Sequence, residues 1–451
     1  MKLSRWTLFV PEYPVQGDYL AYNTRTQAIV VVNQELKDIL AGLPESRMSA
    51  AADGAELKEN LKILEEMGIV VEDDEDEVQS LEYWFDRMKY ETNGLNITIL
   101  TTYDCNFACS YCFEEAVKKK VYMDLQTSKQ VVSWITNVAT KHRVHKIELV
   151  FYGGEPMLNL TAIEYISRTI REWAKERWVK FGFNMVTNGS LLTRDVVSRF
   201  IELGLLSVQI TVDGNKISHD ASRPFRTGEG SFEIILNNIV SIADKVKVHL
   251  TGNFNSSTFN NMLKLLDVLE EKGLKEKLAS VNFSPIMARL GNNNGDGAPR
   301  LMEMGGCKAF FEEEHYQENL TLSKEVRRRG FKTSPAIGVN VCPVLKNDTM
   351  VIIDPTGIIY KCPSFVGHPE FAVGDIRNED LNRRHVENMT MDLWKKCLDC
   401  PYVPMCGGGC RFSAYLRSGD TKSLACDRGY LDKVWQEYVK MDYEQEMKTP
   451  G

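Results

Sequence analysis

Six short apolar runs, separated by helical patterns, constrain the fold of this chain more than any other feature. Each is rich in β-branched or aromatic residues, and they cover Leu95–Thr101, Lys146–Tyr152, Phe181–Thr187, Ser207–Val212, Val246–Asn253 and Val281–Pro285. Strands that alternate with helices predict a parallel sheet with right-handed crossovers. The fold class is therefore α/β, either an open doubly wound sheet or a partial barrel. In both architectures the active site lies at the carboxyl ends of the strands.

The regions on either side of this repeat have a different character. Residues 1–78 are predicted to form a small α+β unit, with strands at Trp6–Val10, Tyr19–Asn23, Ala28–Val32 and Ile69–Val71 and helices at Gln34–Gly42 and Ala55–Gly68. The acidic run 72–77 is predicted to be a solvated linker or helix lead-in that ends this unit. We further predict a domain over 79–300, a bridging segment over 301–340 and a cysteine-rich domain over 341–451.

Composition limits the classes of function. The net charge of −8 over 451 residues argues against a general nucleic-acid binder. The first residues contain no apolar signal core, and no stretch approaches a membrane-spanning run. We therefore expect a cytoplasmic protein with no membrane partner. Eleven cysteines in such a chain point to metal binding or catalysis rather than to disulfides.

The cysteines Cys105, Cys109 and Cys112 directly follow the first predicted strand. Their spacing, CxxxCxxC, offers three thiolates where a four-iron cluster has four iron corners. One iron is left without a cysteine, and chemistry can take place there. Structural zinc sites usually pair cysteines as CxxC couples and take four ligands from the protein, so zinc fits this triplet poorly.

With the aromatic Tyr111 before its last cysteine, this triplet resembles that of the radical S-adenosylmethionine (SAM) superfamily. The resemblance implies a partial (β/α)6 TIM-like barrel and a 4Fe–4S cluster held by the three thiolates. The amino and carboxyl groups of S-adenosylmethionine would chelate the fourth iron. Reductive cleavage of this cofactor yields a 5′-deoxyadenosyl radical, which abstracts a hydrogen atom from the substrate.

Motifs after the later strands support the resemblance. Gly153-Gly154-Glu155-Pro156 is similar to the family's GGEP turn, where a carboxylate or a main-chain carbonyl can receive the ammonium of the cofactor. The resemblance also implies cofactor contacts by Tyr111 and by the two glycines of this turn, Gly153 and Gly154. Three further contacts are implied: Asn188 with a ribose hydroxyl or carboxylate, Thr211 with the ribose and Arg223 with the carboxylate. Weaker candidates are Asn253 for a polar contact and Met287 for the adenine, whereas His219 is predicted to be structural.

Seven cysteines near the carboxyl end form a second pattern, at Cys342, Cys362, Cys397, Cys400, Cys406, Cys410 and Cys426. Their spacing resembles the SPASM region, which carries two auxiliary 4Fe–4S clusters in radical enzymes acting on peptides and proteins. The resemblance assigns Cys342, Cys362 and Cys410 to a cluster nearer the active site, and Cys397, Cys400, Cys406 and Cys426 to an outer one. A pair of zinc sites is the alternative.

The nearer cluster is one ligand short in this assignment. Cys307 could fill the gap, although it lies thirty-five positions before Cys342, or it could be a free buried thiol. An open corner could instead bind a substrate thiolate. The full expectation is three 4Fe–4S clusters per chain.

The amino-terminal unit resembles the winged-helix-like recognition domain of natural-product maturases, which takes a leader peptide as an added strand. In that interpretation Ala28–Val32 offers apolar and main-chain contacts, whereas the alternative is a structural cap on the barrel. The resemblance as a whole implies a peptide maturase that forms a cysteine thioether and receives electrons from a flavodoxin or ferredoxin. Alternatives are a carbon–carbon cross-linking or epimerising maturase, an anaerobic sulfatase-maturing enzyme, and a metal-dependent peptide-binding scaffold without turnover.

Overall fold

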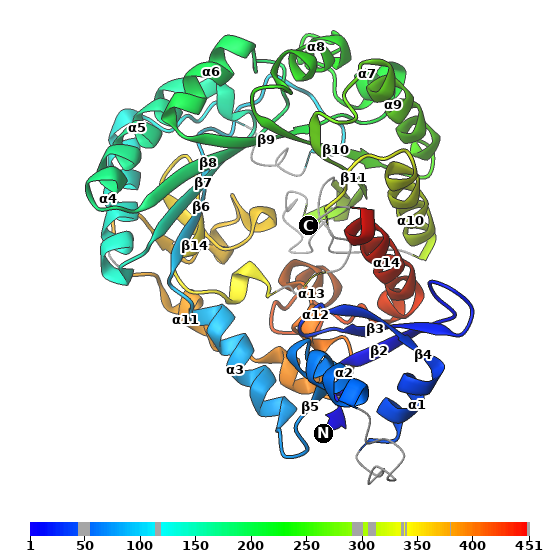
Figure 1. Cartoon of the computed structure of the whole chain (residues 1–451). Coiled ribbons are helices and arrows are strands. Elements are labelled where there is room, and N and C mark those ends of the chain that lie inside the picture. Colours follow the sequence, from blue (N-terminus) through cyan, green and yellow to red (C-terminus); the bar gives the residue numbers. More distant parts are fainter. Residues whose placement is uncertain are drawn as a thin grey trace.

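A computed structural model of the chain describes residues 1–43, 55–112, 119–290, 301–304, 313–334, 338, 341–378 and 380–448. Its largest element is a mixed sheet of nine strands, in the order β11-β10-β9-β8-β7-β6-β14-β15-β16. Helices cover the outside of the sheet, which curves into an open arc (Figure 1). No described helix is both long and apolar enough to cross a membrane.

The six predicted strands form one continuous parallel part of this sheet. They are β6 (Gly94–Leu100), β7 (Lys146–Tyr152), β8 (Lys180–Thr187), β9 (Leu205–Thr211), β10 (Lys247–Phe254) and β11 (Leu278–Pro285). Alternate residues such as Ile97, Leu149 and Phe183 are fully buried in the main core. The prediction of strand type and order is confirmed. The sequence left two architectures open, a doubly wound sheet and a partial barrel, and the curved sheet corresponds to the partial barrel.

Amphipathic helices follow the strands and pack on the outer face of the arc (Figure 1). They are α4 (Leu125–His142), α5 (Leu160–Glu176), α6 (Arg194–Leu203), α7 (Lys216–Ser222), α8 (Phe232–Ile242), α9 (Phe259–Glu271) and α10 (Glu313–Arg328). In α5, for example, Ile163, Ile166 and Ile170 recur at helical spacing and are completely buried. Helix α10 lies inside the predicted bridging segment and packs against β11 and α9, so the barrel helices continue into that segment.

Three short strands that sequence patterns do not indicate extend the barrel sheet beyond β6. They are β14 (Met350–Ile353), which pairs in parallel with β6, and the antiparallel β15 (Ile358–Tyr360) and β16 (Gly374–Asp375). Cys342 precedes β14 and Cys362 follows β15. The cysteine-rich carboxyl-terminal region is therefore joined to the barrel edge by main-chain hydrogen bonds.

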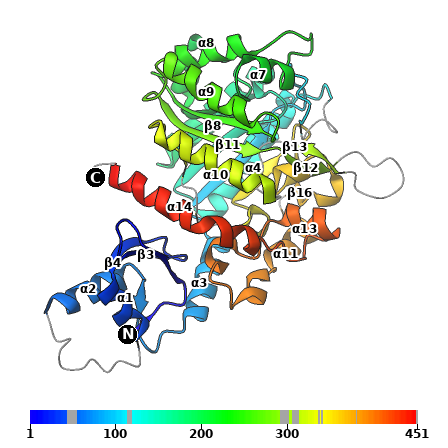
Figure 2. The same cartoon turned by 90° about the vertical axis from the view of Figure 1, so that its right-hand side faces the viewer.

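The amino-terminal unit contains the predicted strands and helices. Strands β2 (Thr7–Pro11), β3 (Asp18–Asn23) and β4 (Ile29–Asn33) form an antiparallel sheet, and β1 (Lys2–Leu3) pairs with β5 (Val70–Val71). Helices α1 (Gln34–Ala41) and α2 (Ala55–Glu66) complete it. In Figure 2 this unit lies to one side of the barrel, with the carboxyl-terminal helix α14 (Arg428–Lys448) between them.

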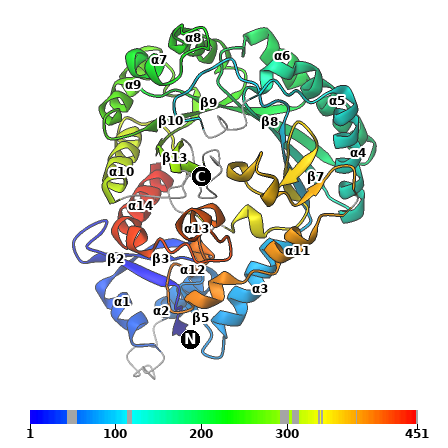
Figure 3. The ribbon, with the colours of Figure 1, turned by 180° about the vertical axis from the view of Figure 1, so that it is seen from behind.

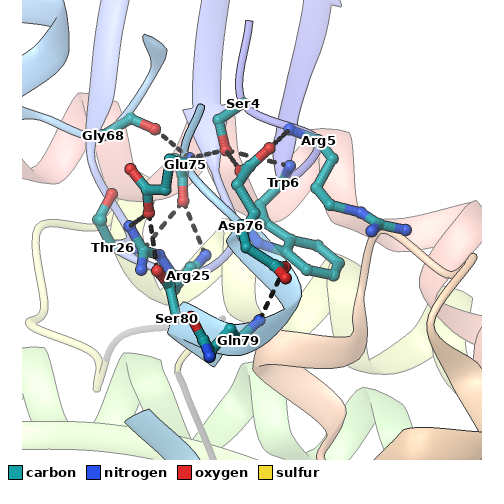
Figure 4. Close-up of polar contacts among 12 residues, drawn as sticks. Ser4, Arg5, Trp6, Arg25, Thr26, Gly68, Glu75, Asp76, Gln79 and Ser80 are labelled. Atoms are coloured by element: carbon teal, nitrogen blue, oxygen red, sulfur yellow. Dashed lines mark hydrogen bonds and ion pairs between the residues drawn. The ribbon is translucent and has the colours of Figure 1, made fainter. Parts of the chain in front are cut away.

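The acidic run leads into helix α3 (Glu77–Tyr90) and is bound to the amino-terminal residues (Figure 4). Asp76 caps the helix by accepting hydrogen bonds from the main-chain N–H groups of Val78 and Gln79. The buried Glu77 carboxylate accepts from the hydroxyl of Ser4 at 2.5 Å. The run therefore leads into the helix, as predicted, and four of its six acidic residues are exposed to solvent.

The remaining elements belong to the carboxyl-terminal region and to a hairpin near the barrel mouth. They are α11 (Arg383–Met389), α12 (Val403–Cys406), α13 (Arg411–Ser418), β12 (Met287–Leu290) and β13 (Leu301–Met304). Figure 3 shows α12 and α13 between the amino-terminal unit and the open side of the arc. Helix α12 ends at Cys406 and α13 begins directly after Cys410, so this part of the cysteine-rich region lies between the amino-terminal unit and the barrel.

Candidate active site

The loop that carries the cysteine triplet directly follows β6, at the carboxyl edge of the sheet, and Cys105 lies five positions after Leu100. Cys105 and Cys109 are buried and Cys112 is half-buried. On one side, the main-chain N–H groups of Gly154 and Glu155 donate to the carbonyls of Thr102 (3.1 Å) and Asp104 (2.8 Å). The loop is thus anchored to the turn after β7, as the parallel-sheet rule predicts.

On its other side, the same loop is joined to the segment that carries Arg223. The N–H of Ala108 donates to the carbonyl of Pro224 at 2.9 Å, and the N–H of Arg226 donates to the carbonyl of Asn106 at 2.9 Å. Phe107 and Phe225 pair as an isolated β-bridge with their rings in edge contact. Two sequence motifs about 115 residues apart are therefore held side by side.

The Gly153-Gly154 turn fits against the cysteine loop so closely that a side chain has no room. A Cβ atom on Gly154 would lie 2.2 Å from the carbonyl oxygen of Asp104, and one on Gly153 would lie 2.4 Å from that of Thr102. The glycines therefore allow the turn to approach the residues that precede Cys105.

The carboxylate of Glu155 is completely buried and connects this turn to the next one. It accepts hydrogen bonds from the hydroxyl of Thr187 (2.8 Å) and from the N–H groups of Asn188 (2.7 Å) and Met157 (3.0 Å). Burial raises the pKa of Glu155, while these three hydrogen bonds act to lower it. Glu155 thereby fixes the position of the Thr187-Asn188 turn. Its predicted contact with a cofactor ammonium stays a prediction.

Asn188 lies against the first cysteine of the triplet. Its side-chain amide nitrogen is 3.9 Å from the sulfur of Cys105 and donates to the amide oxygen of Asn106 at 2.7 Å. The hydroxyl of Thr211, at the end of β9, is half-buried and lies 3.1 Å from the hydroxyl of Thr251. Both residues lie at the carboxyl ends of strands, as predicted. The side chain of Met287 is outside the described part of the structure.

Tyr111, Asp213 and Arg223 form a buried polar network beside the triplet. The Tyr111 hydroxyl donates to the Asp213 carboxylate and accepts from Nη1 of Arg223 at 2.8 Å. Asn253 supports both partners, because its N–H donates to Asp213 at 2.7 Å and its amide group donates to Tyr111 at 3.3 Å. The sequence singled out Tyr111 for cofactor contact, but no local signal indicated its hydrogen bond to Asp213.

Arg223 carries a buried positive charge close to the thiol of Cys109. Burial lowers its pKa, but the nearby Cys109, Tyr111 and Asp213 outweigh this effect, so the net pKa lies above its ordinary value. Its Nε atom is buried and has no hydrogen-bond partner among the described residues. A buried guanidinium with an unpaired N–H is suited to an anionic ligand such as a carboxylate.

His219 has the structural role that the sequence predicts. Its Nδ1 accepts a hydrogen bond from the N–H of Asp213 at 3.1 Å, and its Nε2 lies 3.0 Å from the hydroxyl of Ser231. That hydroxyl donates to the carbonyl of Arg223 at 2.7 Å. Burial lowers the pKa of His219 to about 3, so the ring is neutral and supports both Asp213 and Arg223.

The four cysteines assigned to the outer cluster surround a single cavity. Cys397, Cys400, Cys406 and Cys426 all line a space of about 250 Å³. Because a water molecule takes up about 30 Å³ of liquid, this cavity has room for a multi-atom group. Burial raises the pKa of the Cys406 thiol to about 11, so its thiolate needs a compensating positive charge such as bound iron. The donor set and the space fit an iron–sulfur cluster.

The three cysteines assigned to the nearer cluster also lie together. Cys362 and Cys410 pack against the same aromatic group, formed by Phe365, Phe371 and Phe412. Burial raises the pKa of the Cys342 thiol, and the nearby thiol of Cys410 raises it further. Among described residues, no three His, Cys, Asp or Glu side chains converge on one metal-ion position. Cys307 lies outside the described residues.

The amino-terminal sheet packs directly against the loop that holds the outer-cluster cysteines. Thr24 donates from its hydroxyl to the carbonyl of Pro401 at 2.7 Å, and Arg5 donates to that of Leu398 at 2.7 Å. The Tyr22 hydroxyl contacts the sulfur of Met405 at 3.3 Å. The two regions therefore form one continuous interface.

Comparison with known proteins agrees with this geometry. The model of the radical SAM superfamily matches residues 99–269, which run from the end of β6 through α9. The radical SAM cyclopropyl synthase TigE of Paramaledivibacter caminithermalis is 21% identical over 440 residues, covering 89% of this chain and 87% of TigE. The cysteine-type anaerobic sulfatase-maturating enzyme of Clostridium novyi is 24% identical over 330 residues, covering 68% of this chain and 85% of that enzyme.

The fold also matches solved structures. Streptococcus suis SuiB bound to precursor peptide SuiA is 12% identical, with a TM-score of 0.51 over 94% of this chain and 99% of that chain. At this level of identity the match concerns the fold alone. Because it spans nearly the whole chain, the shared fold extends well beyond the region that matches the superfamily model.

Proposed function

Because residues 99–269 match the radical SAM superfamily, we propose that the chain is a radical SAM maturase that modifies a ribosomally made precursor peptide. The observation that carries this proposal is the loop of Cys105, Cys109 and Cys112, packed beside Arg223, whose buried Nε lacks a partner among the described residues. The triplet would hold the 4Fe–4S cluster, and Arg223 would bind the carboxylate of S-adenosylmethionine. When bound, the cluster and S-adenosylmethionine supply the 5′-deoxyadenosyl radical that removes a hydrogen atom from an acceptor residue.

The residues around the triplet orient the cofactor and exclude water. Tyr111 and Asp213 fix the guanidinium of Arg223, and neutral His219 fixes the main chain of Asp213. Asn188 would contact the ribose or the carboxylate. Because these polar groups are buried and hydrogen-bonded before the cofactor binds, they need little reorganisation when it does.

The amino-terminal unit is proposed to bind the leader of the precursor. Strand β4 is at an edge of its sheet and, among described strands, pairs only with β3. Its residues Ile29, Val30 and Val31 are half-buried. A leader added as a further strand would gain main-chain hydrogen bonds and apolar contacts there. SuiB, which is bound to its precursor peptide, has the same fold over most of this chain.

We propose that the product contains a thioether between a peptide cysteine and a carbon of the acceptor residue. The C–S bond replaces one C–H and one S–H bond, so the peptide loses one hydrogen atom, one proton and one electron. A cluster held by Cys342, Cys362 and Cys410 would supply the electron acceptor, and a flavodoxin or ferredoxin would supply the electrons that start the reaction. With a third cluster on Cys397, Cys400, Cys406 and Cys426, the chain would hold about twelve irons.

Mass spectrometry tests this chemistry. The full-length enzyme is incubated anaerobically with S-adenosylmethionine, dithionite and a cysteine-containing precursor peptide. The expected product is two hydrogens lighter, and its cysteine resists alkylation. A variant with Cys105, Cys109 and Cys112 all changed to alanine is the control and should leave the peptide unchanged.

Carbon–carbon bond formation is the second candidate, because TigE, which matches 89% of this chain, is a cyclopropyl synthase. The same experiment separates the two. A product two hydrogens lighter that keeps an alkylatable thiol would favour the carbon–carbon bond and exclude the thioether.

A further inference from the structure

Arg411 is a completely buried arginine, with none of its surface exposed. A buried guanidinium without partners is strongly destabilising, so the groups that bind Arg411 decide whether it can be accommodated. It donates hydrogen bonds to the carbonyls of Thr421 (2.9 Å), Ser423 (2.7 Å) and Gly409 (2.9 Å), and also to that of Gly408. Among the described residues no carboxylate forms an ion pair with Arg411, although the charge of Asp420 is near enough to interact with it.

The carbonyls that Arg411 binds belong to the chain between ligands of different predicted clusters. Gly408 and Gly409 join Cys406, assigned to the outer cluster, to Cys410, assigned to the nearer one. Gly409 has a φ of +86°, and a Cβ atom there would lie 2.0 Å from the carbonyl oxygen of Ala425. This glycine therefore permits close packing of the connection against the chain next to Cys426.

Arg411 lies beside cysteines of both predicted clusters. It directly follows Cys410 in the chain, and Cys410 is assigned to the nearer cluster. Its guanidinium binds the carbonyls of Gly408 and Gly409, which connect Cys410 to Cys406 of the outer cluster. The charge of Arg411 therefore lies close to both sites.

We propose that Arg411 is a positioning residue that fixes the two auxiliary clusters relative to each other and supplies a positive charge that both share. The inference rests on the proposed assignment of the seven cysteines to two clusters. A nearby cation stabilises the reduced, more negative form of an iron–sulfur cluster and so raises its reduction potential. One charge between two clusters raises both potentials together. The triplet cluster, held by a different loop, does not depend on it.

Redox titration followed by electron paramagnetic resonance tests this role in the reconstituted full-length enzyme. Arg411→Met removes the charge and Arg411→Lys keeps it. Arg383→Met is the matched control, because the Arg383 side chain is 92% exposed on helix α11. Iron per chain is measured for each protein.

In Arg411→Met we expect both auxiliary potentials to fall while the potential of the triplet cluster stays unchanged. Arg411→Lys and Arg383→Met should keep the wild-type values. If Arg411→Met does not take up the auxiliary clusters, its iron should fall from about twelve to about four, and Arg411→Lys should restore the full count with wild-type potentials.

Three results would overturn the inference. The first is a fully loaded Arg411→Met in which one or neither auxiliary potential moves. The second is an Arg411→Lys that is as empty as Arg411→Met, because charge would then not be sufficient. The third is a wild-type enzyme with only about four irons, which would remove the two-cluster assignment itself and not only the role of Arg411.

Discussion

Gly154→Ala should disable the triplet site through one methyl group. The new Cβ would lie 2.2 Å from the carbonyl oxygen of Asp104, whereas real Cβ atoms essentially never approach a neighbour closer than 3.0 Å. The main chain of Asp104, directly before Cys105, would have to move by at least about 0.8 Å. The hydrogen bond from the N–H of Glu155 to that carbonyl, now 2.8 Å, would be distorted with it.

A displacement of about 1 Å at a reacting centre can cost about a hundredfold in rate. Gly154→Ala should therefore cut the formation of 5′-deoxyadenosine from S-adenosylmethionine by about a hundredfold, or lose about four of twelve irons if the cluster is not held. Gly429→Ala is the matched control, because no atom lies within 4 Å of its added Cβ and Gly429 lies in helix α14. Wild-type iron and wild-type cleavage in Gly154→Ala would refute this account of the turn.

Two further predictions concern the network behind the triplet. Tyr111→Phe leaves two buried polar groups, on Asp213 and Arg223, each short of a partner at about 1–3 kcal/mol. Equilibrium binding of S-adenosylmethionine should therefore weaken at least about tenfold. The control Tyr83→Phe, at a residue that is 69% exposed, should not change this affinity. Equal affinities in the two variants would contradict the prediction. His219 has a folded pKa of about 3, below its ordinary 6.5, so its contribution to stability is present above about pH 6.5 and is lost as the pH falls. Between about pH 7.5 and 5.5, the unfolding free energy of His219→Gln should depend on pH less steeply than that of the wild type, by up to about 1.4 kcal/mol per pH unit. An equal slope in the two proteins would count against a buried neutral ring.

The barrel strands could be predicted because their signal is local. A run such as Lys146–Tyr152 combines β-branched and aromatic residues over one strand length, and the structure places β7 over the same residues. Strand β14 has only four residues, and what makes it a strand is its pairing with β6, about 250 residues earlier. No local pattern reports such a partner. Helix α10 was also not predicted, and the burial of its apolar side depends on β11 and α9, distant in sequence.

The same distinction applies to the site. All three cysteines of the triplet lie within eight residues, from Cys105 to Cys112, so the sequence alone predicts that one loop carries them. The hydrogen bond from Tyr111 to Asp213 joins residues 102 positions apart and depends on how β9 is placed beside the cysteine loop. The burial of Arg411 could not be predicted for another reason. Arginine is usually exposed, and its burial here follows from carbonyls that only the folded chain brings together.

The most direct test of the central claim couples cofactor cleavage to peptide modification. The anaerobic enzyme, loaded with iron and sulfide, is given S-adenosylmethionine, dithionite and its precursor peptide, and 5′-deoxyadenosine and the peptide mass are followed together by liquid chromatography and mass spectrometry. We predict 5′-deoxyadenosine in step with a peptide that is two hydrogens lighter, and neither product when Cys105, Cys109 and Cys112 are alanine. A loaded wild-type enzyme that forms no 5′-deoxyadenosine, or a triplet variant that still does, would contradict the account.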